Sequence, residues 1–279
     1  MIKAERKGVF LGKNTHKKSS RRRPLVPEER RERIARLVEE SGSVKVAMLE
    51  EKFGISPMTA RRDLLALERE GRVQRTHGGA ILPGFAGHED SFQRRMGENV
   101  VAKERLARAA VGLVEAGEAV FIDSSTTAYH VAKRLFEKGL RVTILTNCVP
   151  VMELFSTNRA PRMGLVGTGG SLRRLTLSFV GPHAVRTVNA HFADKLFFSV
   201  KGVTPDGYLT DPDPLEAEVK RAMIERSEEP ILLVDGSKFE RRGLSAIAHA
   251  SQLSRALVVD APEEGIRALQ EAGVEVRRV

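Results

Sequence analysis

The stretch ISPMTARRDLLALEREGRVQRTHGG, residues 55–79, combines a helix start, a pair of arginines and a double glycine. Ser56 is a preferred N-cap residue, and Pro57 suits the first helical position, where its missing N–H costs nothing. Gly71 predicts the end of this helix. The stretch therefore predicts a helix that starts sharply and carries two basic side chains in its first turns.

A β-hairpin is predicted directly after this helix. Residues 72–77 alternate as a strand does, and residues 80–82 predict the returning strand. Between them, Gly78 and Gly79 predict a tight turn with positive φ, which glycine adopts without strain.

Two more helices are predicted before residue 55. The first begins near Pro27, has one apolar face and ends at Ser41-Gly42. The second is short and ends at Gly54. Three helices and a hairpin within residues 26–82 indicate a winged helix-turn-helix domain.

The polar face of the third helix is expected to bind DNA. At 100° per residue its apolar side chains gather within about 60° of one another, and Arg62 lies opposite them with Thr59 and Arg61 on the flanks. The first turns of a recognition helix meet base edges and phosphates in the major groove. Arg75 and His77 on the hairpin are placed as a wing that contacts the flanking backbone. A solvated helix face is the alternative, but the combination of features favours DNA binding.

The charge distribution supports an acidic partner at the N-terminal end. The 279 residues carry a net charge of +10, and residues 1–85 account for most of it, with 20 Lys and Arg against 11 Asp and Glu. Nucleic acid is the usual partner of such a region. Residues 1–25 lack periodicity and are predicted to be a disordered basic tail. This tail is a DNA-tracking arm, a product of a start assigned too early, or a solvated tail without function.

Several classes of protein are excluded by composition. The sequence has no run of about 18 apolar residues, so no membrane span is predicted. A single cysteine, Cys148, excludes an intramolecular disulfide and a Cys-based zinc site and suits a reducing cytoplasm. We expect a cytoplasmic protein without a metal or cofactor.

The remaining chain predicts a larger α/β domain. Residues 83–95 have the composition of a linker, and strands and helices alternate over 96–279. This alternation predicts a mostly parallel sheet with helices on both faces. The predicted strands are 119–122, 141–146, 163–166, 195–200, 230–234, 256–259 and 274–276. Helices are predicted at 126–138, 213–227 and 262–272.

Polar residues that follow these strands form a candidate anion site. The run DSSTT joins a strand to a helix, where hydroxyl groups and free N–H groups favour an anion; its members are Asp123, Ser124, Ser125, Thr126 and Thr127. A plain N-cap needs only one such residue. Asn147, Gly169 and Gly170 also end strands, although each of these motifs is equally consistent with a turn.

Two charged residues complete the candidate set. Lys238 follows the strand at 230–234 and can reach a phosphate as a point charge, although a solvated lysine is as well supported. Glu216 opens a helix, where the helix dipole alone favours a carboxylate. Cys148 is expected to be buried rather than reactive.

The N-terminal motifs also resemble a known family. VAMLEEKFGISPMTARRDLLALEREGRVQRTHGGAIL is similar to the DNA-binding domain of the DeoR family of bacterial transcriptional regulators. The family's Thr-x-Arg-Arg-Asp-Leu core is present at Thr59–Leu64, and its Arg-x-x-Gly-Gly-Ala ending at Arg75–Ala80. Members usually begin near the first helix, so the basic extension before Pro27 departs from the pattern.

The resemblance extends over nearly the whole chain after Pro27. DSSTT, LTN, ADKLFFSVKGV, EAEVKRAMIE and VDGSKF look like successive parts of the family's effector domain, which is similar in fold to ribose-5-phosphate isomerase. This implies a phosphorylated sugar as effector, with its phosphate at Ser124–Thr127. It places Glu216 and Lys238 where the isomerase has a glutamate base and a loop lysine. Lys201 and Gly202 join the effector-binding set because they lie where the isomerase has an acidic segment.

The resemblance favours a sensor over an enzyme. Proton transfer between sugar carbons needs a carboxylate base and further acidic groups, and residues 199–202 carry no carboxylate. We therefore expect a DNA-binding transcriptional regulator, a repressor of sugar or nucleoside catabolism genes, that acts as a homodimer or homotetramer. Two alternatives are a sugar-phosphate isomerase fused to a basic domain, and a non-specific nucleic-acid-binding protein whose second domain oligomerises.

Overall fold

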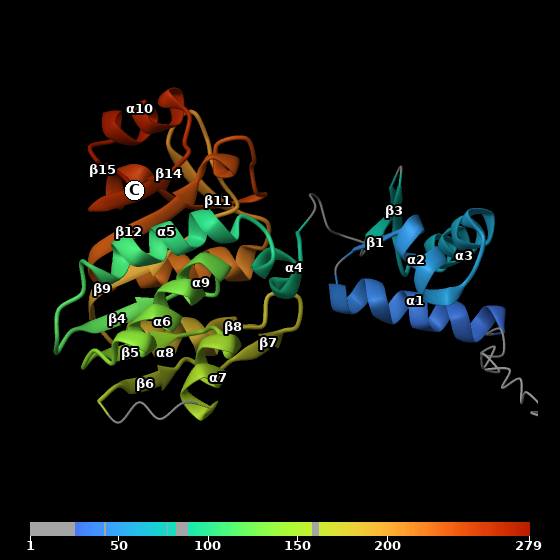
Figure 1. Cartoon of the computed structure of the whole chain (residues 1–279), viewed down its shortest axis with the longest axis horizontal. Helices are drawn as coiled ribbons and strands as arrows, with labels where there is room; N and C mark the ends of the chain where they lie inside the picture. The colour runs from blue at the N-terminus through green and yellow to red at the C-terminus, as the bar shows by residue number, and fades with distance from the viewer. Residues whose placement is uncertain (1–25, 42, 77, 82–88, 158–161) are drawn as a thin grey trace, which may run out of the picture.

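The computed structural model describes residues 26–41, 43–76, 78–81, 89–157 and 162–279 (Figure 1). The predicted tail, residues 1–25, and His77 of the predicted wing lie outside these residues. Within the described ranges no helix is long and apolar enough to cross a membrane.

The N-terminal unit contains the three predicted helices and the predicted hairpin. A third strand, β1, was not predicted, and it pairs with β3 to give the antiparallel order β1-β3-β2. The elements are α1 (Pro27–Ser41), β1 (Ser43–Lys45), α2 (Val46–Phe53), α3 (Pro57–Arg69), β2 (Gln74–Thr76) and β3 (Gly79–Ile81). Two helices, a recognition helix and a β-sheet wing are therefore present as a winged helix-turn-helix domain.

Capping and core packing follow the sequence pattern in this unit. The Ser56 hydroxyl accepts a hydrogen bond of 3.2 Å from the backbone N–H of Thr59, so the predicted N-cap is confirmed. Ala60, Leu64 and Leu67 are fully buried, as the helical period requires. They pack in one core cluster with side chains of α1 and α2.

The predicted role of the double glycine is wrong in its detail. Neither Gly78 nor Gly79 has a positive φ. Instead, a Cβ at Gly79 would lie 1.8 Å from the carbonyl oxygen of Val44 on β1. Glycine is needed there because β1 and β3 approach closely, and the sequence did not predict β1.

The C-terminal unit is built on a seven-stranded, wholly parallel sheet with the order β15-β14-β12-β9-β4-β5-β6 (Figure 1). Each predicted strand corresponds to one strand of this sheet. They are β4 (Ala119–Ile122), β5 (Thr143–Thr146), β6 (Gly164–Gly167), β9 (Ala193–Phe198), β12 (Ser227–Asp235), β14 (Arg255–Val259) and β15 (Glu275–Arg278). The predicted fold class is confirmed.

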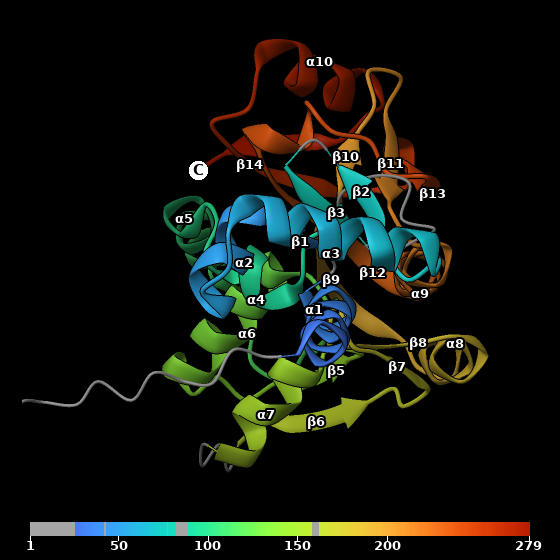
Figure 2. The same cartoon turned by 90° about the vertical axis from the view of Figure 1, so that its right-hand side faces the viewer.

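Helices cover both faces of the sheet, as Figure 2 shows. Side chains alternate across it, so that on β4 Phe121 enters one core cluster while Val120 and Ile122 enter the other. One face carries α5 (Val100–Val111), α6 (Thr126–Lys138) and α7 (Val149–Thr157). The other carries α8 (Pro182–Asn189), α9 (Pro214–Glu225) and α10 (Glu263–Glu271).

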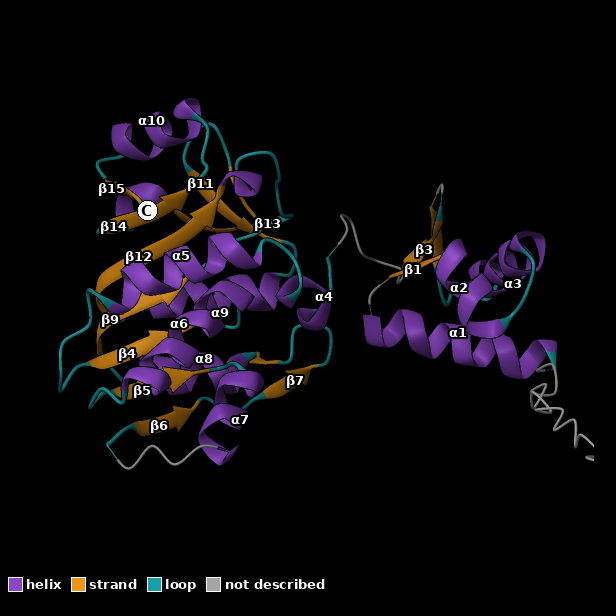
Figure 3. Cartoon of the chain, viewed as in Figure 1, coloured by secondary structure: helices purple, strands orange, loops and turns teal. Residues whose placement is uncertain are grey.

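Short antiparallel elements at the edge of this unit were not predicted (Figure 3). One hairpin is β7 (Ser171–Arg173) with β8 (Ser178–Val180), and a small sheet has the order β10-β11-β13. Its strands are β10 (Gly202–Val203), β11 (Tyr208–Asp211) and β13 (Ser245–His249), and two 3-10 turns are η1 (Gly236–Lys238) and η2 (Ala250–Gln252). β7, β8 and β10 have only two or three residues, which give little periodic signal.

The linker predicted over 83–95 is too long. Residues 89–95 pack onto the C-terminal unit and contain the start of α4 (Phe92–Met96). Phe92 is buried, and its backbone N–H donates a hydrogen bond of 2.8 Å to the carbonyl oxygen of Leu175. The composition was misleading because Pro and Gly occur only in the first half of the range.

Candidate functional site

A pocket lies at the carboxyl ends of three neighbouring strands, β4, β9 and β12. The chain leaves β4 for β5 on one side and later returns to β9 on the other side of β4. The strand order therefore changes direction between β4 and β9, and open α/β sheets bind ligands at such a switch point. Segment 89–103, strand β11 and helix α9 close the pocket from the sides.

The start of α6 forms one wall of the pocket. Ser124, Ser125, Thr126 and Thr127 all line the pocket and are buried. The hydroxyl of Ser125 caps the helix by accepting the backbone N–H of Ala128 at 3.1 Å. This wall thus presents hydroxyl groups and the positive end of a helix to the pocket.

Asp123 supports that wall from behind rather than lining the pocket. One of its oxygens accepts the backbone N–H of Ser125 at 3.0 Å and the hydroxyl of the same residue at 2.5 Å. The other oxygen lies 3.3 Å from the ammonium group of Lys220. We therefore assign Asp123 a positioning role.

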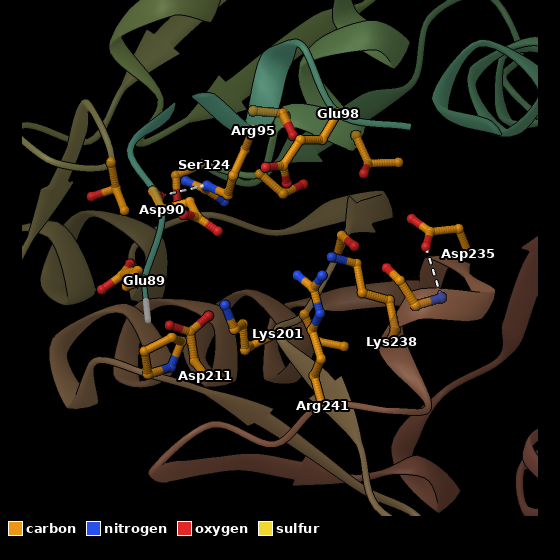
Figure 4. Close-up of a pocket in the computed structure, with 18 of the residues that line it drawn as sticks. Glu89, Asp90, Arg95, Glu98, Ser124, Lys201, Asp211, Asp235, Lys238 and Arg241 are labelled. Carbon is orange, nitrogen blue, oxygen red and sulfur yellow. Dashed lines mark hydrogen bonds between the residues drawn. The ribbon is translucent and has the colours of Figure 1, made fainter. Parts of the chain in front are cut away.

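Cationic side chains gather in the pocket (Figure 4). Lys201, Lys238 and Arg241 converge from one side, and Arg95 points in from the other. Burial, together with the nearby Arg95, Arg241 and Lys201, lowers the pKa of Lys238 to about 8. Burial likewise lowers the pKa of Lys201. Cations crowded in this way favour the binding of an anion between them.

Lys103, on α5, adds to this crowding. Burial and the charge of Lys238 lower its pKa to about 8. Its ammonium group donates to the carbonyl oxygens of Arg95 and of Glu98, the latter at 2.6 Å. The pocket therefore holds two lysines whose charge is lost near pH 8.

Buried carboxylates form a second layer behind the cations. Asp211 on β11 accepts a hydrogen bond of 2.8 Å from Lys220. Burial lowers the pKa of Lys220, but the charges of Asp211 and Asp123 outweigh burial and raise it. Glu216 accepts hydrogen bonds from Ser124 at 2.9 Å and from Ser178 at 2.5 Å. Burial, followed by the charge of Asp211, raises the pKa of Glu216.

This layer corrects one sequence argument. Residues 199–202 lack a carboxylate, as noted, but acidic side chains enter the pocket from other elements, including Asp211, Asp235 and Glu98. A shortage of carboxylates is therefore not a property of the site. Asp211 lies on a strand that the sequence did not predict, which is why it was missed.

Besides Asp123, four of the predicted effector residues do not line the pocket. Asn147 follows β5 and donates to the carbonyl oxygen of Phe179 at 3.1 Å, and Gly169 and Gly170 follow β6 beside a separate surface hollow. These strands lie on the side of β4 away from β9, whereas the pocket lies over the ends of β4, β9 and β12, so the residues that follow β5 and β6 lie outside it. At Gly202 a Cβ would lie 1.7 Å from the carbonyl oxygen of Arg241, so this glycine permits close packing.

The other predicted effector residues, Lys201, Glu216 and Lys238, do line the pocket. Sequence reasoning missed the contributions from segment 89–103 and from β11, and further residues of α9 and of the turn after β12. The missed lining residues are Glu89, Asp90, Arg95, Glu98, Asn99, Lys103, Thr176, Ser199, Val200, Asp211, Pro212, Lys220, Asp235, Ser237 and Arg241. For most of these residues, the neighbouring sequence contains no motif that would predict a position close to α6.

The predicted DNA-binding face is exposed on α3. Arg61 and Arg62 are exposed, while Thr59 is partly buried and its hydroxyl lies 2.9 Å from that of Ser56. Arg75 on β2 is exposed, and its guanidinium lies 3.7 Å from the carboxylate of Glu68. These side chains are available to contact nucleic acid.

Arg72 differs from this group. Its guanidinium donates to the carboxylate of Glu32 on α1 at 2.7 and 3.3 Å. It therefore ties the start of the hairpin to α1 instead of extending the wing.

The two units match two parts of one protein family. Residues 30–84 match the description "DeoR-like helix-turn-helix domain", and residues 98–261 match "DeoR C terminal sensor domain". An uncharacterized HTH-type transcriptional regulator of Bacillus subtilis, YulB, is 34% identical over 257 residues, which cover 91% of this chain and 98% of that protein.

Two further relatives are described as repressors. The putative aga operon transcriptional repressor of Escherichia coli O157:H7 is 33% identical, with 92% of this chain and 96% of that protein covered. The lactose phosphotransferase system repressor of Streptococcus mutans is 32% identical, with coverage of 85% and 93%. Among solved structures, ribose 5-phosphate isomerase A of Methanocaldococcus jannaschii is 18% identical with a TM-score of 0.37, covering 51% of this chain and 55% of that one. A likeness at this level carries no argument about the chain.

Proposed function

The chain belongs to the DeoR family of transcriptional regulators, and from this membership we propose that it is a repressor of sugar-catabolism genes controlled by a phosphorylated sugar. The relatives named for the aga operon and for lactose uptake support a sugar operon as the target. The DNA-binding part of the proposal rests on the exposed arginines of α3 and on the wing. We also propose a cytoplasmic location, where such a regulator meets its operator.

One observation carries the effector assignment: the buried, hydroxyl-lined start of α6 faces a group of cationic side chains across one pocket. A phosphate group satisfies both sides, because its oxygens accept from backbone N–H and hydroxyl groups and pair with Lys201, Lys238 and Arg241. The pocket also contains Asp235 and Glu98, whose oxygens suit the hydroxyl groups of a sugar.

We propose binding without catalysis. The carboxylates nearest the phosphate wall are engaged in internal bonds, Asp211 with Lys220 and Glu216 with Ser124 and Ser178. A general base needs an available lone pair within reach of the substrate proton. In the described structure these oxygens instead hold the pocket together.

Two assays test the proposal. Phosphorylated sugars are screened by thermal shift, because a ligand that binds only the native state raises the melting temperature. The sugar phosphate with the largest shift is then added to a complex of the protein with an operator selected from random DNA. We expect operator release. Conversion of ribose 5-phosphate to a ketose would overturn the sensor assignment. The assignment would also be overturned if no sugar phosphate raised the melting temperature and none released the operator.

A further inference from the structure

Segment 89–103 connects the effector pocket directly to the chain that leads to the DNA-binding unit. β3 of that unit ends at Ile81, and Glu89 is the first residue described after it. Glu89 already lines the pocket, and Asp90 and Arg95 follow it in the same wall. A ligand in the pocket therefore meets the residues nearest to the domain connection.

The segment is anchored firmly on both sides of Arg95. Glu89 accepts two hydrogen bonds from Arg173, at 2.8 and 2.6 Å, and both side chains are largely buried. Arg173 also lies 3.1 Å from the carboxylate of Asp213 at the start of α9. Lys103 holds the end of α4 through the carbonyl oxygens described above. A movement of α4 would therefore displace Glu89 or change its hydrogen bonds to Arg173.

Arg95 is incompletely bonded within the described structure. Its Nε donates to the backbone oxygen of Asp90 at 3.1 Å, but its Nη2 is buried and has no hydrogen-bond partner there. Figure 4 shows its guanidinium group beside Ser124, across the pocket from Lys201 and Arg241. A buried guanidinium N–H without an acceptor is costly, and an anionic oxygen is its strongest acceptor.

We propose that Arg95 binds the anionic group of the effector and thereby transmits the ligand state to the segment that joins the two domains. The proposal rests on the function proposed above and adds a residue and a route to it. A bond between Arg95 and the phosphate exists only in the liganded state. It thus supplies the difference in interaction between two states that any switch requires.

The position of α4 makes this bond consequential. The phosphate held at Ser124–Thr127 is fixed to the sheet through α6, whereas Arg95 belongs to a five-residue helix near the domain connection. When Arg95 binds the phosphate, α4 is drawn toward α6, and the geometry of the Glu89–Arg173 ion pair changes. The effector then acts on the domain connection without a change in the sheet.

The test compares Arg95→Gln with Arg94→Gln. Arg94 is the matched control because it is adjacent on α4 but bonds Asp90 at 2.9 Å and Glu98 at 3.3 Å and does not line the pocket. Each variant is first compared with the wild type by its melting temperature without ligand. The probes are inorganic phosphate and the sugar phosphate found in the screen.

Calorimetry should show affinity for the sugar phosphate falling about tenfold or more in Arg95→Gln and less than twofold in Arg94→Gln. With the ligand at saturating concentration, the ratio of operator affinities with and without ligand should approach one in Arg95→Gln and remain at the wild-type value in Arg94→Gln. Equal ligand affinity in both variants, or full operator release by saturated Arg95→Gln, would overturn the proposal.

Inorganic phosphate separates this inference from the proposed function. If no sugar phosphate binds the wild type, the proposed effector is wrong, yet the phosphate-induced thermal shift still tests Arg95. Loss of that shift in Arg95→Gln alone would support Arg95 as the anion ligand. A shift of equal size in both variants would refute it.

Discussion

Asp63, the residue that follows the two exposed arginines of α3, is buried and bound in bidentate fashion by Arg30 of α1, at 2.6 and 3.2 Å. The Arg-Arg-Asp motif thus divides its roles: its arginines face outward, and its carboxylate ties the recognition helix to the first helix. Removing one partner of a buried ion pair leaves the other charge uncompensated.

We predict that Asp63→Ala destabilises the DNA-binding unit by about 3 kcal/mol or more. Hydrogen exchange of the full chain checks this, because amides of α1 and α3 should lose protection while those of β9 and β12 keep theirs. Arg61→Ala is the control, since an exposed substitution changes stability by less than about 0.5 kcal/mol. Unchanged protection of α1 in Asp63→Ala would show that the pair is not a stabilising contact.

Arg62 and Arg75 are predicted to make different kinds of DNA contact. Arg62 is exposed on the recognition helix, so Arg62→Ala should cost about 1–3 kcal/mol and relax the preference at one base pair. Arg75 lies on the wing, so Arg75→Ala should weaken binding to all sequences similarly and reduce the salt dependence. Operator titrations at several salt concentrations measure both. An equal loss on every sequence for Arg62→Ala would contradict its assignment to base contact.

Effector affinity should fall as the pH rises from about 7 to about 9. Lys103 and Lys238 have pKa values lowered to about 8, so they are charged below that pH and neutral above it. An anion gains from the charged forms, and its binding raises both pKa values, so binding takes up protons. Calorimetry in buffers of different ionisation enthalpy measures this uptake. A pH-independent affinity over this window would mean that neither lysine pairs with the ligand.

Lys238→Ala should abolish the response to sugar phosphate and leave operator affinity near normal without it. The Lys238 side chain makes no hydrogen bond or ion pair within the described structure, so its loss removes no internal support. Ser125→Ala is a less specific test, because the Ser125 hydroxyl caps α6 and its loss also costs about 1 kcal/mol of stability. Loss of operator binding in Lys238→Ala would indicate a structural role.

The protein is predicted to be a homodimer or homotetramer. One recognition helix in one major groove gives little specificity, whereas a two-fold dimer reads paired half-sites. Sedimentation at micromolar concentration should show at least a dimer, both with and without operator DNA. A monomer under both conditions would contradict the prediction.

Local sequence was sufficient to predict all seven strands of the parallel sheet and the three helices of the DNA-binding unit. The helices each bury one face, which imprints a repeat of 3.6 residues, whereas the sheet is covered on both faces, so its strands appear as short apolar runs. The cap at Ser56 and the hydroxyl-rich start of α6 were also predictable, because both depend on residues that are adjacent in the chain.

The composition of the pocket depended on the order of the strands. The sequence marked the ends of β4, β5, β6 and β12 alike, but the pocket lies over β4, β9 and β12, and β5 and β6 lie on the other side of β4, so Asn147 and Gly169 lie outside the pocket. Arg95 and Asp211 enter the pocket from α4 and β11, and the local sequence of these elements does not indicate that they lie close to α6. Contacts between residues distant in the chain are set by packing of the whole domain, and a short stretch of sequence does not encode them.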